Sequence, residues 1–148
     1  MSPNQLFSIA NFLALSCWLL LAALPGKKWV SAVVTGVAVP VLFAAIYSVI
    51  IALTFSTAEG GFSSLSDVAS LFSNPWLLLA GWIHYLAFDL LVGTWETRDA
   101  RERGISHLLV LPCLVLTFLF GPAGWLLYLG VRSLYGRVRQ PQLQASMP

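Results

Sequence analysis

The sequence predicts an all-α protein, a polytopic bundle of four transmembrane helices whose fourth member is long and kinked. Hydrophobic residues make up 58% of the 148 positions and charged residues only 9%, against roughly 25% in ordinary soluble domains. Four long stretches carry no charge at all, namely 1–26, 29–58, 68–88 and 104–131. A soluble domain of this size has too little interior to bury so much apolar surface, so a membrane protein is predicted.

Each uncharged stretch is long enough to cross a hydrocarbon core of about 30 Å, which takes roughly 20 helical residues. Because no water satisfies backbone polar groups inside lipid, these spans should be helical. We predict a single domain over residues 1–139 and a disordered tail over 140–148. The four predicted spans are about 5–24, 29–55, 75–97 and 105–135.

Local signals place the first two spans. Pro25-Gly26 ends the first span, and Lys27-Lys28 marks the aqueous boundary. Its first positive charge follows the apolar run and no clean cleavage site comes after it, so this span is predicted to be retained rather than removed as a signal peptide. Pro40 lies inside the second span, where it removes a backbone donor and is expected to kink the helix.

The connection over 56–74 is predicted to lie on the membrane surface. It is rich in serine and contains Gly60-Gly61. Within it, Ser66-Asp67 is expected to cap a short amphipathic helix that runs through Phe72. A lid over a binding site is the alternative interpretation of this segment.

The last two spans begin with clear signals but differ in length. Pro75 is a favourable first helical position for the third span. The fourth stretch is roughly ten residues longer than one crossing needs, and Gly121-Pro122-Ala123-Gly124 interrupts it. Its two halves are short for separate crossings, so one long helix kinked at Gly121-Pro122 is predicted, with a re-entrant pair of helices as the alternative.

Charge predicts the partners and the orientation. The net charge of +2 is slight and forms no polybasic run, so nucleic acid is excluded as a partner; the lipid bilayer is the expected partner. With four spans, the side of the first and third connections carries five Lys and Arg residues, and the other side carries three, Arg132, Arg137 and Arg139. The positive-inside rule then predicts, by a narrow margin, that both termini face away from the cytoplasm.

Ionisable residues in and after the third span are the candidates for function. His84 and Asp89 lie well inside the span, where an ionisable group facing lipid costs several kcal/mol, so both should face the bundle interior. Asp89, Glu96 and Asp99 share one stripe of the helix, and His84 lies on a neighbouring face. His107 opens the next span at the aqueous end near Glu96 and Asp99. We therefore predict that one pocket collects these five residues.

Two chemistries fit this set. A carboxylic acid kept protonated by apolar surroundings donates a proton while a neighbouring base removes one. Alternatively, the histidines and carboxylates bind a divalent metal, although the chain has no spacing such as HExxH. A structural interpretation also stands, in which Asp89 is paired inside the bundle and the charges after residue 95 form a solvated helix end. The sequence assigns no cofactor and leaves metal binding open.

Part of the chain resembles a known family of membrane proteins. The residues that carry the resemblance are Trp82-Ile83-His84-Tyr85-Leu86-Ala87-Phe88-Asp89-Leu90, Asp99, Ile105-Ser106-His107 and Leu119-Phe120-Gly121-Pro122-Ala123-Gly124. They are similar to the abscisic-acid-deficient-four-like family, whose plant members are linked to neoxanthin synthesis. The resemblance implies an isomerisation of the epoxide violaxanthin to the allene neoxanthin, with His84, Asp89, Asp99 and His107 on the family pattern. Plant members have Arg at the position of Ser106 and Cys at that of Gly121.

Three functions are consistent with these observations. The first is a membrane isomerase, or related acid/base catalyst, acting on a carotenoid or another long apolar lipid. Asp89 would be its acid and His84 its base or orienting group, with Glu96 and His107 nearer the aqueous mouth. The second is a non-catalytic membrane protein that binds a carotenoid or lipid or scaffolds partner helices. The third is a metal-dependent lipid hydrolase.

Overall fold

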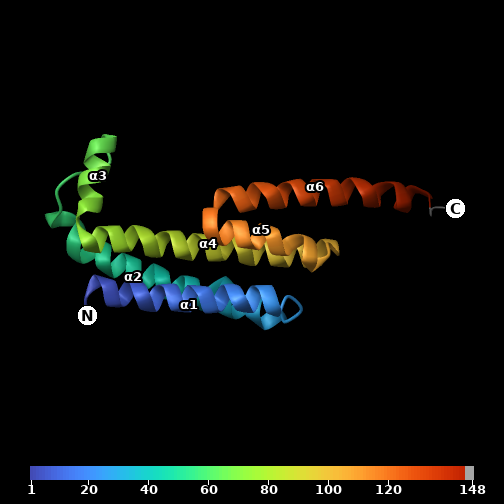
Figure 1. Cartoon of the computed structure of the whole chain (residues 1–148), viewed down its shortest axis with the longest axis horizontal. Helices are drawn as coiled ribbons and strands as arrows, with labels where there is room; N and C mark the ends of the chain where they lie inside the picture. Colours follow the sequence, from blue (N-terminus) through green and yellow to red (C-terminus); the bar gives the residue numbers. More distant parts are fainter. Residues whose placement is uncertain (146–148) are drawn as a thin grey trace.

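Figure 1 shows the computed structural model of the chain, in which long helices lie side by side and one short helix stands across the end of the bundle. The structure describes residues 1–145, and beyond residue 135 only the backbone. This part of the chain contains helices, turns and loops but no strand, which confirms the predicted all-α fold. The elements are α1 (Pro3–Ala23), η1 (Val30–Ala38), α2 (Val39–Thr54), η2 (Phe55–Thr57), α3 (Leu65–Ser73), α4 (Pro75–Arg103), α5 (His107–Phe120) and α6 (Pro122–Ala145).

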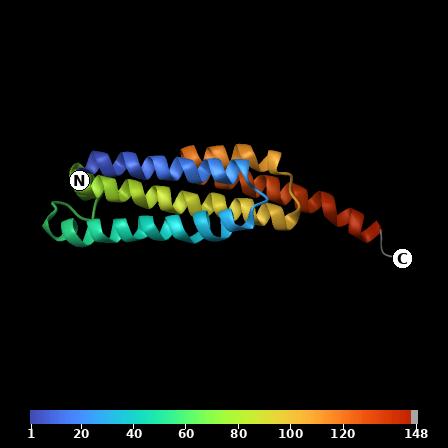
Figure 2. The same ribbon diagram turned by 90° about the horizontal axis from the view of Figure 1, so that it is seen from below.

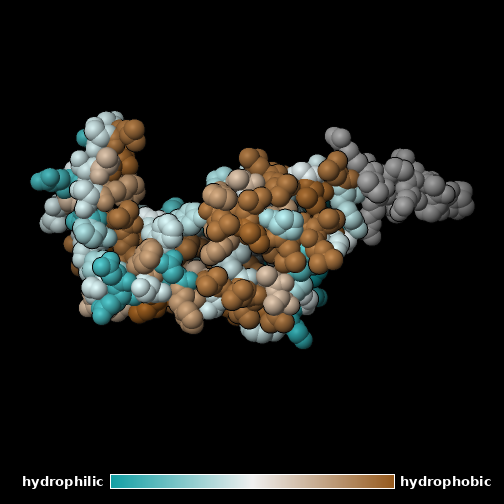
Figure 3. All heavy atoms as spheres, in the orientation of Figure 1, coloured by the Kyte–Doolittle hydropathy of each residue, from teal (hydrophilic) through white to brown (hydrophobic). Residues whose placement is uncertain are grey.

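Three helical segments in the described residues are long and apolar enough to cross a membrane, and they follow the first three predicted spans. They are Pro3–Ala23, Val30–Thr57 and Pro75–Arg103, whereas α5 is apolar but shorter. Large hydrophobic side chains such as Phe12, Leu19 and Leu53 point outward, and Figure 3 shows hydrophobic residues over much of the visible face. An apolar exterior suits lipid rather than water, so this chain is a membrane protein.

Helix α4 is the centre of the bundle and packs against α1, α2 and α5. Pro75 occupies its first turn as predicted, and Gly104 ends it in the left-handed conformation at φ 69°. Small residues let the helices approach, as is common between membrane helices. At Gly93 a Cβ would overlap the Trp18 ring of α1. On the other side, the Thr94 hydroxyl of α4 donates to the Thr35 hydroxyl at 2.8 Å in a buried contact.

The second apolar segment changes helix type along its length. Residues Val30–Ala38 form a π-helix, which passes into α2 at Val39, next to Pro40. Proline has no backbone N–H to offer the preceding turn, so the regular hydrogen-bond pattern is broken there. The structure thus places the predicted irregularity at the predicted residue, as a switch from π- to α-helix.

The surface connection contains the predicted short helix with a different cap. Helix α3 begins at Leu65, and the side chain of Ser64 accepts from the Asp67 backbone N–H at 3.1 Å. Ser64, rather than Ser66-Asp67, is therefore the N-cap. Figure 1 shows α3 standing across the start of α4, an arrangement in which it would lie along the membrane surface.

The C-terminal part corrects the predicted fourth span. Helix α5 ends at Phe120, α6 starts at Pro122, and the two pack against each other as an antiparallel hairpin (Figures 1 and 2). Gly121 adopts φ 46° and ψ −98°, a conformation that L side chains avoid, and Pro122 is suited to begin a helix. One long kinked helix is therefore replaced by the re-entrant pair. Helix α6 continues to Ala145, past the expected start of a disordered tail, and residues 146–148 lie outside the described part.

The hairpin changes which ends of the helices share a side. Figure 1 shows the N-terminus at one end of the molecule and the C-terminus at the other, where α1 and α4 finish. The prediction of both termini on one side required four full crossings, so this arrangement does not support it. The end shared by α4 and α6 is fixed by contacts: the Tyr135 hydroxyl donates to the Gly104 carbonyl at 2.7 Å, and Arg132 pairs with Asp99 at 3.0 Å.

Candidate functional site

The five predicted site residues do not form one pocket. Asp89 and Glu96 lie together on the side of α4 that faces the hairpin, whereas His84, Asp99 and His107 have other neighbours. Among the side chains that the structure describes, no group of three or more His, Cys, Asp or Glu residues could hold a metal ion.

Asp89 lies beneath the turn between α5 and α6. A Cβ at Gly121 would stand 3.0 Å from Asp89 Oδ1 and 3.3 Å from Oδ2, so the backbone of the turn rests on the carboxyl group. Tyr85 lies one helical turn earlier on α4, and its hydroxyl donates to the Phe118 carbonyl at 3.1 Å. The Asp89 Oδ2 atom is buried and has no hydrogen-bond partner in the described structure.

Glu96 is the most deeply buried acid of the described residues, with 0% of its surface exposed. The Thr117 hydroxyl of α5 donates to its Oε1 atom at 2.9 Å. Its Oε2 atom is buried without a partner within the described residues. Gly124 of α6 packs so closely on Thr117 that a Cβ there would overlap the threonine. The hairpin turn therefore covers both carboxyl groups.

The turn also brings two helix ends to the middle of the bundle. Backbone that leaves regular helix inside a membrane must be buried against protein or face water, and here α4 supplies the cover. The end of α5 is satisfied in part by the Tyr85 hydroxyl on the Phe118 carbonyl. The start of α6, where a helix favours negative charge, lies beside Asp89. We call Asp89, Glu96, Tyr85 and Thr117 the carboxyl site.

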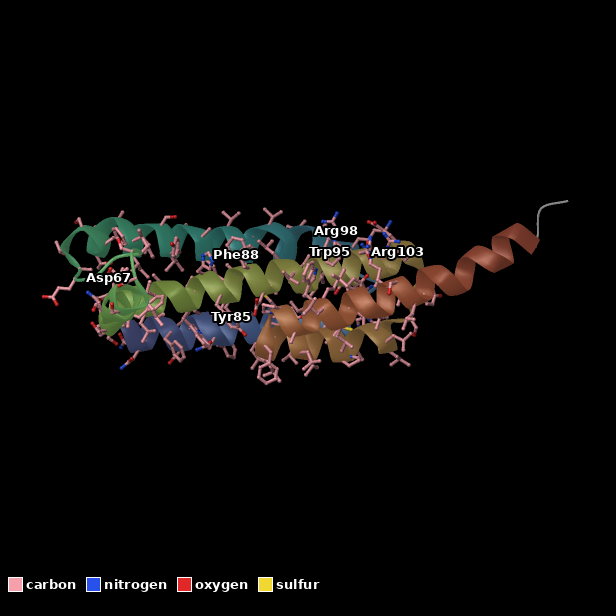
Figure 4. All side chains as sticks on the ribbon, turned by 90° about the horizontal axis from the view of Figure 1, so that it is seen from above. Asp67, Tyr85, Phe88, Trp95, Arg98 and Arg103 are labelled. Atoms are coloured by element: carbon pink, nitrogen blue, oxygen red, sulfur yellow. The ribbon has the colours of Figure 1, made fainter. Side chains whose placement is uncertain are left out.

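Asp99 belongs to a network that ties α4 to α6. Its Oδ2 atom accepts from the Tyr128 hydroxyl at 2.6 Å and from Arg132 Nε at 3.0 Å, and Arg103 Nε lies 2.9 Å away. Tyr128 is fully buried and meets Trp95 edge to face at 5.4 Å. Figure 4 labels Trp95 and Arg103 at this end of α4. Asp99 is therefore paired, as the structural interpretation of the sequence allowed.

His107 connects α5 to α1 instead of joining the acids. Its Nε2 atom lies 2.8 Å from the Ala22 carbonyl oxygen, and nearby Arg101 donates to the Pro25 carbonyl at 3.3 Å. Both contacts fix the end of α1 against the α4–α5 connection. The expected approach of His107 to Glu96 and Asp99 is not seen in these hydrogen bonds.

His84 does not face the bundle interior as predicted: its side chain is exposed, on the side of α4 towards α2 and α3. Its ring stacks on Phe88 at 4.5 Å and meets Tyr47 of α2 at 5.6 Å. It lines a cavity of about 270 Å³ between α2, α3 and α4. Figure 4 shows Phe88 on the side of α4 towards α2 and Tyr85 on the other side, where its hydroxyl meets Phe118 of the hairpin.

Sequence reasoning missed Thr117, Tyr128 and Arg132 as partners of the acids. Thr117 stands in an apolar stretch, and Tyr128 and Arg132 follow the Gly-Pro break. For Tyr128 and Arg132 the available signal was the break itself, because a helix pair that reverses there returns these two residues to α4, whereas a kinked span carries them away.

The family model described as ABA DEFICIENT 4-like matches residues 5–128. This range includes the carboxyl site, the hairpin turn and all five predicted residues. No curated protein and no solved structure matches the chain. The family match covers most of the sequence and agrees with the resemblance carried by the residues from Trp82 to Gly124. This membrane protein therefore belongs to the ABA DEFICIENT 4-like family.

Proposed function

We propose that this protein is a membrane-embedded acid/base catalyst, an isomerase acting on a carotenoid or a similar long apolar lipid, in which Asp89 and Glu96 exchange protons with the substrate. One observation carries the proposal: Asp89 and Glu96 both lie where α4 faces the hairpin, and each has a buried oxygen without a described partner. Such atoms are rare because each costs about 1–3 kcal/mol. Ionisable residues kept inside a membrane usually serve function.

The surroundings of Asp89 favour a protonated carboxyl group. Its Oδ2 atom is buried without a described partner, and burying a charge without a partner is costly. A phenol has a single proton to donate, and the Tyr85 hydroxyl gives it to the Phe118 carbonyl rather than to Asp89. A protonated acid is what an epoxide oxygen, or another weakly basic oxygen, needs for activation.

Asp89 is thus the proposed general acid, and the base is Glu96 instead of His84. His84 faces α2 and α3, whereas Glu96 lies under the same turn as Asp89. In one turnover Asp89 protonates the substrate oxygen, its C–O bond breaks, and Glu96 removes a proton from carbon. Transfer of that proton from Glu96 back to Asp89 restores the starting state, so the isomerisation needs no oxidant or reductant.

A substrate reaches the carboxyl site when the hairpin moves. The turn at Gly121 rests on Asp89, and α6 contacts α4 far less than α5 does. The Asp99 contacts with Tyr128 and Arg132 hold α6 in place. Closure of a covering element over an acid/base site excludes water from the reaction.

The proposed orientation has the basic end in the cytoplasm. Lys27-Lys28 follow α1, the arginines of α4 lie in its last two turns, and Arg132 meets them from α6. The acids Glu59 and Asp67 belong to the opposite end, with α3. By the positive-inside rule, three crossing segments leave the N-terminus outside the cytoplasm and return α6 to the cytoplasmic side.

The test is co-expression with enzymes that make carotenoids, followed by chromatography of the pigments. The wild-type chain is expected to convert an epoxide-bearing pigment. Asp89→Asn and Glu96→Gln should each lower conversion about 100-fold or more, in the range for loss of a general acid or base. Glu102→Gln removes an exposed acid of the same helix and should convert normally. Unchanged pigments with the wild-type chain in every background, or full conversion by both carboxyl variants, would refute the proposal.

A second candidate is a lipid- or carotenoid-binding protein without catalysis. The observation that favours it is the position of His84, which lines the cavity between α2, α3 and α4, whereas Asp89 and Glu96 face the hairpin. The acid–base pair predicted from sequence is therefore not assembled. Purified protein that carries stoichiometric pigment, with Asp89→Asn and Glu96→Gln leaving the pigment unchanged and bound, would support it. The dispersed positions of His84 and His107 give a metal-dependent hydrolase no comparable support.

A further inference from the structure

We propose that the cavity between α2, α3 and α4 is a separate binding site for one end of an uncharged, membrane-borne molecule. The bound end carries a hydroxyl or carbonyl group on a ring-sized apolar body. The site lies on the opposite side of α4 from the carboxyl site, so it does not depend on proton exchange by Asp89 and Glu96.

Three helical segments and one loop residue line the cavity, which is open to the surface beside the exposed side chains of Phe62 and Phe72. Its volume is about 270 Å³, and most of its lining is aliphatic or aromatic. The lining residues are Tyr47, Ile51 and Phe55 from the second segment, Phe62 from the loop, Val68, Leu71 and Phe72 from α3, and Leu77, Gly81 and His84 from α4.

Glycine and aromatic contacts hold α3 over this space. A Cβ at Gly81 would stand 3.0 Å from Phe72 Cε1, so only the bare backbone of α4 lets the Phe72 ring pack at that depth. Leu71 is only 4% exposed and anchors the same turn of α3. Phe55 and Phe62 stack with their ring centroids 5.7 Å apart. The amphipathic helix is thus packed as a wall of the cavity.

The polar groups of the lining lack partners. His84 contacts the rings of Phe88 and Tyr47, yet no hydrogen bond joins its imidazole, or the Tyr47 hydroxyl, to a described side chain or backbone group. An imidazole and a phenol each supply a donor and an acceptor. His84 is exposed and Tyr47 half-buried in the chain itself. At hydrocarbon depth no water satisfies such groups, so a ligand with one hydroxyl or carbonyl group between them would supply the missing partner.

The charge and size of the lining narrow the ligand further. No Asp, Glu, Lys or Arg lines the cavity, so a charged group would be buried without a counter-ion, at high cost. The volume lies just below the roughly 300–1,000 Å³ of pockets that enclose whole drug-sized ligands. The cavity therefore suits one ring of a longer molecule. His84 is nine residues after Pro75, about 14 Å along the helix, which suits an uncharged group at hydrocarbon depth.

The experiment compares two probes of the same shape. Purified full-length protein in phosphatidylcholine nanodiscs is titrated with tritiated 4-octylcyclohexanol, and separately with tritiated octylcyclohexane, which lacks the hydroxyl. We expect saturable binding of one alcohol per chain and at least 10-fold weaker binding of the hydrocarbon. His84→Phe should weaken alcohol binding about 10-fold, which corresponds to about 1.4 kcal/mol. His84→Gln keeps a donor and an acceptor and should restore much of it.

Two further variants make the result specific to this site. Val68→Trp fills the cavity from α3 and should abolish saturable binding, whereas Asp89→Asn should leave it unchanged because it lies across α4. Equal affinity for the two probes, no saturable binding of the alcohol, or wild-type affinity in both His84→Phe and Val68→Trp would overturn the proposal. Loss of binding in Asp89→Asn would also overturn it, because the site would then not be separate from the carboxyl site.

Discussion

At the scale of single residues, the partners of an acid decide what it can do. Asp89 and Asp99 lie on one stripe of α4, so their helical positions, predicted from the sequence, do not distinguish their roles. Asp99 is held by Tyr128, Arg132 and Arg103, so it stabilises the contact between two helices. Asp89 meets a glycine turn and keeps one oxygen without a described partner, as the proposed proton exchange requires.

Thr117→Val should destabilise the protein through Glu96. The substitution removes the donor to Glu96 Oε1 and leaves a buried carboxyl group without a described partner, at a cost of about 1–3 kcal/mol. Thr117→Ser keeps the hydroxyl and serves as the matched control. Unfolding in detergent, followed by near-ultraviolet circular dichroism, should give a lower midpoint for Val than for Ser. Equal midpoints would mean that this hydrogen bond contributes nothing.

Gly93→Ala should separate α1 from α4. The added Cβ overlaps the Trp18 ring, which is itself buried, and overpacking of this kind costs about 1–3 kcal/mol. Gly130→Ala is the matched control, because a Cβ at Gly130 of α6 meets nothing within 4 Å and alanine favours helix. Thermal unfolding in detergent should show a lower midpoint temperature for Gly93→Ala than for the wild-type chain, and no decrease for Gly130→Ala. A stable Gly93→Ala protein would contradict the close approach.

At the scale of elements, the turn between α5 and α6 is the decisive feature. The first three spans follow from run length and from the breaks at Pro25-Gly26 and after residue 55, because such signals are local. Whether Gly121-Pro122 kinks a helix or reverses it depends on contacts across the bundle. The contacts of Tyr128 and Arg132 with Asp99 support reversal, because they return α6 to α4, and neither pair is local in sequence.

Gly121→Ala should destabilise the hairpin selectively. The residue sits at φ 46°, and a Cβ would press on the Asp89 carboxyl group at 3.0 Å. A non-glycine residue in such a conformation costs about 1–3 kcal/mol. Gly26→Ala, at a turn where a Cβ meets nothing within 4 Å, is the control. Hydrogen exchange should show faster opening of α5 and α6 in Gly121→Ala only; unchanged protection there would argue against the hairpin.

At the scale of the whole molecule, the hairpin gathers the positive charge. With one kinked fourth helix, Arg132 would lie with the acids of α3. With the re-entrant pair, Arg132 meets Asp99 and Arg103 at the end of α4. The difference in positive charge between the two ends of the bundle, which is small for four full crossings, thus becomes large, because a single turn reverses the direction of the last helix.

Cysteine labelling in sealed vesicles tests this arrangement. In a chain whose native Cys17 and Cys113 are replaced by alanine, single cysteines are placed at Gly61, Glu102 and Ser133. A membrane-impermeant maleimide should label positions 102 and 133 from the cytoplasmic side and position 61 from the other side. A fourth full crossing would instead pair position 133 with position 61, and labelling of that pattern would reject the proposed topology.

The sequence by itself determined that this protein lies in lipid and that its fold is helical. It also determined the first three apolar segments and the stripe of acids on the third segment. These properties depend on composition and on the period of one helix, which are local quantities. The tertiary structure alone decided which residues meet. It folded α6 back along α5, assigned Thr117 to Glu96 and Tyr128 to Asp99, and separated His84 from the acids. Such pairings arise from packing between distant segments, and no local pattern encodes them.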